Sequence, residues 1–237
     1  MTTSTNKIIE TNTPPPARVC RECGKEFAPD EVCAVIAKWA TVCPTCSENH
    51  IRQENARDAL EAGNRRLRVW ENLCPPDFAA TDPKRLPRPE MLARVLQWKF
   101  GRRGLLLHGP TGKGKSRCAW LLLKREFDAG RRIRVIDHSV GFRYAETFAQ
   151  SAASAAVWID QQSEAEILFL DDVFKARLTD SLEQALFTVI STRTEQGSPN
   201  IVSTNDTGDS LAGRLSPDRG QALIRRLVEY STAIAFV

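Results

Sequence analysis

One run of residues has a spacing that is typical of phosphate binding. It is Gly109-Pro110-Thr111-Gly112-Lys113-Gly114-Lys115-Ser116. The run fits G-x-x-x-x-G-K-[ST], in which glycines let backbone N–H groups surround phosphates. An apolar segment at 105–108 precedes it and a helical pattern follows, as this motif requires. We expect these residues and Arg117 to bind ATP. Lys115 would reach the β and γ phosphates, and Ser116 would place its hydroxyl on Mg²⁺.

Two carboxylates and one amide follow the next apolar segments. Asp171 and Asp172 come directly after Ile167–Leu170, and Asn205 ends the segment that begins at Ile201. We expect Asp171 to hold Mg²⁺ and Asp172 to orient the water that attacks ATP. The Asn205 amide would contact the γ-phosphate or that water. Taken singly, an aspartate here could be a helix cap and Asn205 a turn residue, so the prediction depends on the phosphate loop.

Four of the seven cysteines form two pairs, Cys20-x-x-Cys23 and Cys43-x-x-Cys46, separated by 19 residues. This spacing is typical of a structural zinc site made of four thiolates. Disulfides are the alternative, and they are rare in cytosolic proteins. Cys33 and His50 could replace a ligand, although a buried cysteine and a surface histidine are the simpler interpretations. We expect Cys74 and Cys118 to be packing residues.

The elements that must position these residues follow from the apolar pattern. Short apolar runs, which are typical of buried parallel strands, alternate with helical segments. Strands are expected at 105–108, 132–137, 167–170, 200–204 and 232–237, and helices at 114–129 and near 140–153, 179–195 and 217–229. The sequence therefore predicts an α/β domain with a parallel sheet and helices on both faces.

We divide the chain into four parts. A disordered tail spans 1–17, a zinc-ribbon-like module 18–50, a charged helical connector with a Pro-rich linker 51–89, and the ATPase domain 90–237. The connector is expected to be an exposed helix pair broken near Gly63. Helical spacing then resumes over 90–100.

Composition and charge exclude several classes of protein. The 237 residues, with 42% apolar side chains, are too apolar for disorder throughout and do not fit collagen or a disulfide miniprotein. No run is long enough to span a membrane, and no secretory signal begins the chain, so we expect a cytoplasmic protein. The net charge of +4 is uneven, because residues 51–135 carry 20 basic and 9 acidic side chains. This excess favours a polyanionic partner, although solvated helix faces explain it equally well.

Taken together, these segments resemble the AAA+ ATPase core of the DnaC, DnaI and IstB family. The segments that carry the resemblance are GPTGKGKS, ILFLDD, IVSTN and ALIRRL, together with CPPDF and the RT of STRTEQG, and they cover about Cys74 to Val237. The resemblance implies that Asn205 is sensor 1 and that Arg226 is an arginine finger acting on a neighbouring subunit. Arg225 and Arg219 are alternatives for the finger, and surface ion pairs would explain all three. Because the sequence ends with TAIAFV, we expect no helical lid after the core and slow, switch-like hydrolysis.

The leading hypothesis is an ATPase that forms a homo-oligomer on ATP and DNA and loads a replicative helicase onto single-stranded DNA. An IstB-like helper of DNA transposition is the alternative, and the cysteine module argues mildly against it. A small-molecule kinase would need an arginine-bearing lid, and a non-catalytic adaptor would not need Asp171 and Asp172. For contact with DNA phosphates we expect the connector and the clusters Lys99–Arg103 and Arg131–Arg134 to be best placed. The zinc module could bind the helicase or DNA.

Overall fold

The computed structural model describes residues 17–28, 40–137, 151–175, 178–206, 210–211 and 215–237. By its internal contacts the chain divides into two units, Met1–Leu67 and Arg68–Val237. The tail expected over 1–17, apart from residue 17, and the cysteine at position 33 lie outside the described residues. Among the described residues, no helix has both the length and the apolar character that crossing a bilayer requires.

The first unit contains a small β-ribbon and most of one long helix. Strands β1 (Arg18–Val19) and β2 (Glu26–Phe27) pair antiparallel, with the first cysteine pair in the connection between them. Helix α2 (Pro44–Leu73) begins at the second cysteine pair, and its residues from Arg68 onward belong to the second unit. The division expected at residue 50 therefore falls inside this helix.

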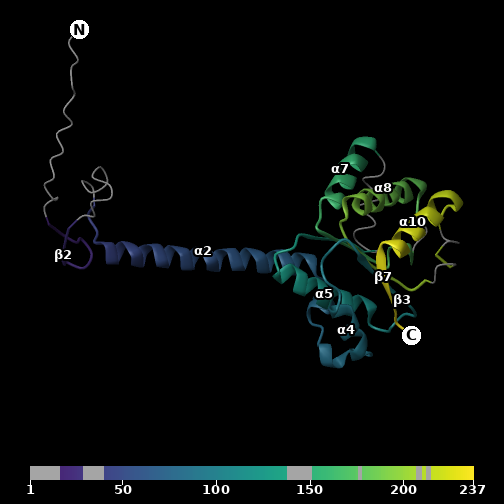
Figure 1. The fold of residues 1–237 in the computed structure, drawn as a ribbon, viewed down its shortest axis with the longest axis horizontal. Helices are drawn as coiled ribbons and strands as arrows, with labels where there is room; N and C mark the ends of the chain where they lie inside the picture. Colours follow the sequence, from purple (N-terminus) through teal and green to yellow (C-terminus); the bar gives the residue numbers. More distant parts are fainter. Residues whose placement is uncertain (1–16, 29–39, 138–150, 176–177, 207–209, 212–214) are drawn as a thin grey trace, which may run out of the picture. The chain divides into compact units, whose positions relative to one another are not determined.

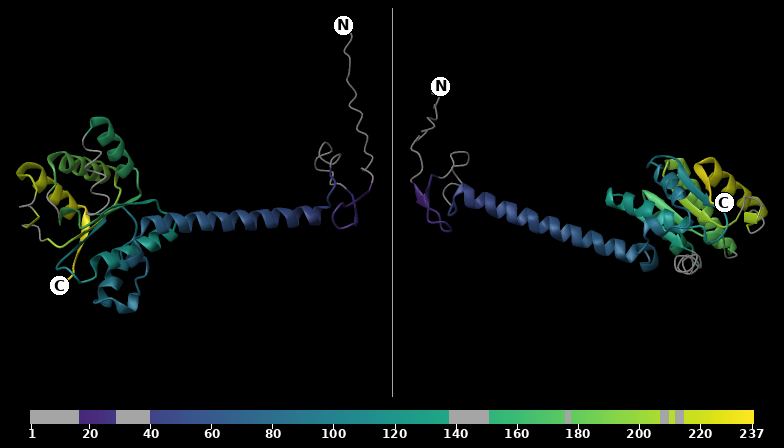
Figure 2. Two further views of the ribbon diagram at one scale, coloured as in Figure 1. Left: turned by 180° about the vertical axis from the view of Figure 1, so that it is seen from behind. Right: turned by 90° about the horizontal axis from the view of Figure 1, so that it is seen from below.

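The prediction of a helix pair in the connector is wrong, because α2 continues through Gly63 as one unbroken helix (Figure 2). A glycine in a helix costs about 1 kcal/mol relative to alanine, which weakens a helix but does not by itself end it. Ion pairs one turn apart flank the glycine, since Glu61 lies 3.9 Å from both Arg57 and Arg65. The segment also contains no proline after Pro44. Local charge pairing and the absence of a true breaker explain the continuous helix.

The second unit is built around a five-stranded parallel sheet with the strand order β4-β5-β6-β3-β7. Figure 1 labels β3 and β7 of this sheet, with helices on both sides of it. The strands are β3 (Gly104–His108), β4 (Ile133–Asp137), β5 (Ile167–Asp171), β6 (Asn200–Thr204) and β7 (Ser231–Ala235). The helices between them are α5 (Lys115–Asp128), α7 (Ala152–Ser163), α8 (Asp180–Gln196) and α10 (Pro217–Glu229), and the short helix η3 (Val173–Lys175) follows β5. The α/β class predicted from the apolar runs is confirmed.

Alternate residues of the strands face two different helix layers. Leu105, Leu107 and Phe169 pack with α5 and with α4 (Pro89–Leu96), and Trp70 at the end of α2 joins this cluster. Leu168 and Leu170, which flank Phe169 in sequence, pack on the other face with α7, α8 and α10. Both faces of the sheet are thus covered, which is why its strands are apolar throughout.

The segment before the sheet folds into short helices that begin at prolines. These are α3 (Pro76–Ala79), η2 (Pro83–Arg85) and α4, and each has proline in its first turn. Proline suits that position because the first amides of a helix have no partner inside it. The helix expected near 140–153 lies almost entirely outside the described residues. Helix α7 begins at its end and was not expected, because its alanine-rich sequence shows little apolar periodicity.

Candidate functional site

The phosphate-binding run connects β3 to α5 in the way that the motif predicts. Gly109 follows the strand with a φ of 132°, and a Cβ there would lie 2.4 Å from the carbonyl oxygen of Phe236 at the end of β7. Gly114 has a φ of 89° and precedes the first residue of α5. Both positions require glycine, since side chains rarely adopt this backbone conformation. The loop therefore ends at a helix N-terminus, which attracts anions.

Lys115 connects the loop to the far side of the site. Its buried ammonium donates to the carbonyl oxygens of Gly109 (2.7 Å) and Pro110 (2.8 Å) and to Oδ1 of Asn205 (2.7 Å). The Nδ2 of Asn205 in turn donates to both carboxylate oxygens of Asp172, at 3.0 and 2.7 Å. Burial lowers the pKa of Lys115, and the nearby Asp172 and Asp171 oppose this. The lysine, amide and carboxylate predicted from separate segments form one hydrogen-bonded chain.

A second chain of hydrogen bonds surrounds Asp171. The hydroxyl of Ser116 donates to its Oδ1 at 2.7 Å, and the hydroxyl of Ser203 donates to the same oxygen. Burial raises the pKa of Asp171, while the two hydroxyls act in the opposite direction. Asp172 has a left-handed backbone with a φ of 54°, and its N–H donates to the Ser203 carbonyl oxygen at 3.0 Å. An oxygen-only set of a hydroxyl and a carboxylate suits Mg²⁺.

One cavity collects most of the predicted nucleotide-binding residues. The predicted residues that line it are Thr111, Gly112, Gly114, Lys115, Ser116, Arg117, Asp172 and Asn205. Gly109, Pro110, Lys113 and Asp171 do not line it. The first two accept hydrogen bonds from the Lys115 ammonium, and Asp171 accepts one from Ser116, which does line the cavity. Arg117 also contacts the preceding segment, donating to the Asp77 carbonyl oxygen and the Thr81 hydroxyl, both at 3.0 Å.

The cavity contains three residues that sequence reasoning did not predict, namely Phe78, Pro87 and Ser203. Phe78 and Pro87 come from the segment before the sheet, and no motif in that segment predicted that it lines the nucleotide cavity. Ser203 belongs to β6 and lies two residues before Asn205, which follows the strand. The sheet register places Ser203 directly beside Asp171. Only knowledge that β5 and β6 are neighbours would have identified it.

The candidate arginine finger and its alternatives lie on α10, outside this cavity. The guanidinium of Arg226 lies 4.9 Å from the ring centre of Phe187 on α8. Arg225 is exposed, and Arg219 lies within 3.6 Å of Asp180 and 3.9 Å of Glu183. Action on a neighbouring subunit stays a prediction.

The four predicted zinc ligands come together in the first unit. The sulfur atoms of Cys20, Cys23, Cys43 and Cys46 lie within 4.8 Å of one another. The Sγ atoms of Cys23 and Cys43 are 3.7 Å apart. Sulfurs bound at about 2.3 Å to a tetrahedral zinc ion lie about 3.8 Å apart, so the set fits this ion.

Backbone amides support a thiolate at the first position of the cluster. Hydrogen bonds from the backbone of Cys23 and then of Cys43, whose N–H donates to the Cys20 sulfur at 3.3 Å, lower the pKa of Cys20 to about 6. Hydrogen bonds with Cys43 and Cys23 raise the pKa of Cys46. His50 is not part of the cluster, because its Nε2 contacts the Glu22 carboxylate at 2.6 Å.

Comparison with known proteins identifies the fold of the second unit. No protein-family model and no curated protein matches the sequence. Among solved structures, DnaI is 16% identical with a TM-score of 0.57, and the match covers 71% of this chain and 96% of that one. The DnaC helicase loader is 19% identical with a TM-score of 0.53, covering 70% and 98%.

The replication initiator DnaA, bound to AMPPCP and single-stranded DNA, is 16% identical with a TM-score of 0.50. That match covers 66% of this chain, which spans about half (47%) of the DnaA chains it matches. At these identities the likeness establishes the fold. The chain has the AAA+ P-loop fold of these structures, preceded by a four-cysteine cluster that fits a zinc module, and the fold class expected from the sequence is confirmed.

Proposed function

We propose that this protein is a Mg²⁺-dependent ATPase of DNA replication that loads a replicative helicase onto single-stranded DNA. One observation carries the ATPase part. Lys115, Ser116, Asp171, Asp172 and Asn205 come from three separate segments and form two hydrogen-bonded chains at one cavity beside a glycine-rich loop.

Each side chain has a distinct role in this proposal. The loop amides and Lys115 bind the phosphates, and Ser116 and Asp171 would hold Mg²⁺, which supplies positive charge beside the phosphates. Asp172, held by the Asn205 amide, orients the attacking water and accepts its proton. Asn205 contacts both Lys115, which binds the phosphates, and Asp172, which accepts the proton of the attacking water. It therefore holds these two side chains in a fixed position relative to each other.

The partners are proposed from the fold and the charge. The similar structures include helicase loaders and an initiator bound to single-stranded DNA, and the excess of basic residues in 51–135 favours a polyanion. We place the protein in the cytoplasm as a homo-oligomer on ATP and DNA, in which Arg226 reaches the neighbouring subunit's nucleotide. The four cysteines would hold a structural zinc ion.

The test compares ATP turnover by the parent protein, Lys115→Ala and a control, Lys124→Ala, with and without single-stranded DNA. Lys124 lies on the same helix and pairs with Asp128 at 2.7 Å, away from the cavity. We expect Lys115→Ala to lower kcat/KM by at least about 100-fold, since it removes the cation next to the phosphates. Turnover equal to that of the parent would refute the phosphate-loop assignment.

The same three proteins are then given the host's replicative helicase and a single-stranded circle. If loading is the function, the parent and the control stimulate unwinding in the presence of ATP, and Lys115→Ala does not. An active ATPase that stimulates no helicase would leave the ATPase assignment intact and contradict the loading role.

A further inference from the structure

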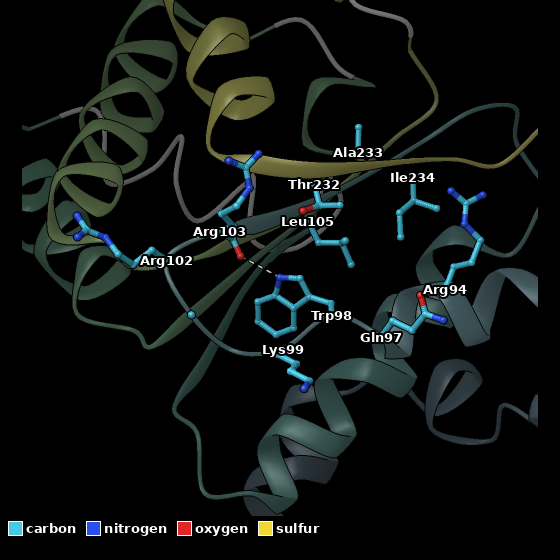
Figure 3. Close-up of a pocket in the computed structure, with 11 residues that line it drawn as sticks. Arg94, Gln97, Trp98, Lys99, Arg102, Arg103, Leu105, Thr232, Ala233 and Ile234 are labelled. Carbon is cyan, nitrogen blue, oxygen red and sulfur yellow. Dashed lines mark hydrogen bonds between the residues drawn. The ribbon is translucent and has the colours of Figure 1, made fainter.

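A cavity of about 570 Å³ lies between the end of α4 and the edge strand β7 (Figure 3). Its basic lining residues are Arg94, Lys99, Arg102 and Arg103. It shares no lining residue with the nucleotide cavity. Strand β3 connects the two cavities, because it begins directly after Arg103 and ends at the phosphate loop.

The basic residues of this cavity have no acidic partner among the residues that the structure describes. No Asp or Glu lines it, and the segment 93–104 contains four basic residues and no acidic one. Within the described parts of the chain, no carboxylate lies within ion-pair distance of any of the four. Arg103 donates to the Ser231 carbonyl oxygen at 2.9 Å, and Arg94 only approaches the sulfur of Met91 at 3.9 Å.

Other exposed basic residues of this unit do find acidic partners. Arg131 and Arg132 lie 2.8 and 3.8 Å from Glu166, and Arg131 also stacks on the ring of Phe100. Of the two clusters that we expected to contact DNA, Arg131–Arg134 shares one carboxylate, that of Glu166, among its three basic residues. The cluster Lys99–Arg103 has no carboxylate within ion-pair distance among the residues that the structure describes. Cations gathered in a concave site repel one another, and a bound anion relieves that repulsion.

The aromatic residue of the cavity indicates what kind of contact the site can make. Trp98 is buried, its Nε1 donates to the Arg103 carbonyl oxygen at 2.8 Å, and its ring meets Phe100 edge-on. It offers no open ring face on which a base could stack. The remaining lining residues on β7 include Thr232 and Ala233, which are small and exposed. The cavity can therefore recognise phosphate charge but has little with which to read bases.

We propose that this cavity binds the sugar-phosphate backbone of single-stranded DNA without sequence preference. The choice of DNA among polyanions rests on the proposed function. Arg94 and Lys99 bind the phosphates, and Arg103 holds the edge of β7. The guanidinium of Arg102 points away from the cavity, toward Gly197 (Figure 3), and adds positive charge beside it. Since Arg103 is followed immediately by β3, the DNA site and the phosphate loop lie near opposite ends of one strand.

The experiment measures binding of a labelled oligo(dT) strand by fluorescence anisotropy over a range of salt concentrations. The test variant is the double substitution Arg94→Gln and Lys99→Gln. The control removes two charges elsewhere on the same unit, with Arg132→Gln and Arg134→Gln. All four residues are exposed, and binding of a fluorescent ATP analogue verifies that each variant is folded.

We expect the test variant to bind DNA at least about 10-fold more weakly than the parent at low salt. The slope of log K against log salt should fall by about 1.4, since each of the two phosphate contacts on a single strand contributes about 0.7. The control should retain parental DNA binding, a mixed-sequence strand should behave like oligo(dT), and ATP-analogue binding should not change.

Three results would overturn the proposal. One is an equal loss of DNA binding in the test and control variants. Another is tighter, pocket-dependent binding of polyglutamate than of DNA, which would make an acidic protein the partner. The third is a parent that binds no DNA, and the Lys115→Ala turnover experiment would then show whether the ATPase assignment survives separately.

Discussion

At the scale of single residues, the site depends on one hydroxyl that no motif predicted. Ser203 donates to Asp171, and both its hydroxyl and its carbonyl oxygen accept the N–H of Asp172, at 3.3 and 3.0 Å. It therefore orients the proposed Mg²⁺ ligand and also holds the left-handed backbone of the proposed base. Groups that orient metal ligands in this way affect metal affinity about 10- to 100-fold.

Replacing Ser203 by alanine should raise the Mg²⁺ concentration needed for half-maximal binding of a fluorescent ATP analogue by about 10-fold or more. Binding of the analogue without Mg²⁺ should not change, because Ser203 makes no contact with the phosphate loop among its recorded hydrogen bonds. The conservative Ser203→Thr keeps the hydroxyl and should behave like the parent. An alanine variant with parental Mg²⁺ dependence would show that Ser203 does not position Asp171.

At the scale of elements, one buried arginine joins helix α8 to the strands beside it. Arg193 is fully buried, and its guanidinium donates to Oδ1 of Asn200 at 2.7 Å and to the carbonyl oxygens of Ala165 and Pro199 at 2.6 and 2.8 Å. Burial lowers its pKa to about 10. These acceptors belong to the segments that lead into β5 and β6, so the arginine fixes where the two strands begin.

Arg193→Met should lower the free energy of unfolding by about 3 kcal/mol or more, since several buried carbonyl groups would lose their donor. Urea denaturation followed by tryptophan fluorescence measures this change. Arg132→Met, at an exposed position, should change stability by no more than about 0.5 kcal/mol. A small effect at position 193 would mean that water or a rearranged loop satisfies those carbonyls.

At the scale of the whole molecule, the two units differ in what stabilises their folded state. The second unit contains both large hydrophobic clusters, and every residue in them lies at Trp70 or beyond. Among the described residues of the first unit, the buried apolar side chains are Cys20 and Cys43. A unit with so little core needs another source of stability, and a zinc ion held by four thiolates would supply it.

Purified protein should therefore contain about one zinc ion per chain, measured by elemental analysis. Cys20→Ser and Cys43→Ser should lose the metal, and Cys118→Ala, which lies in the other unit, should keep it. Removing zinc with a chelator should expose the first unit to proteolysis while ATP-analogue binding persists. A first unit that stays protease-resistant without metal would contradict the structural role.

The sequence by itself determined the parts of the site whose residues are neighbours in the chain. The phosphate loop, the Asp171-Asp172 pair and the cysteine pairs could be predicted because each is a local pattern with its own strand or helix beside it. The prediction of a helix break at Gly63 was wrong, because a single glycine weakens a helix without ending it and ion pairs on both sides offset part of its cost.

Only the tertiary structure decided which distant segments became neighbours. The strand order places β6 beside β5, and this alone makes Ser203 a partner of Asp171. In the same way, Arg131 pairs with Glu166, while Lys99 has no ion pair with any described residue, although both belong to basic clusters in the sequence. The physical reason is that strand pairing, burial and charge neutralisation depend on contacts between residues far apart in the chain, and no local pattern records those contacts.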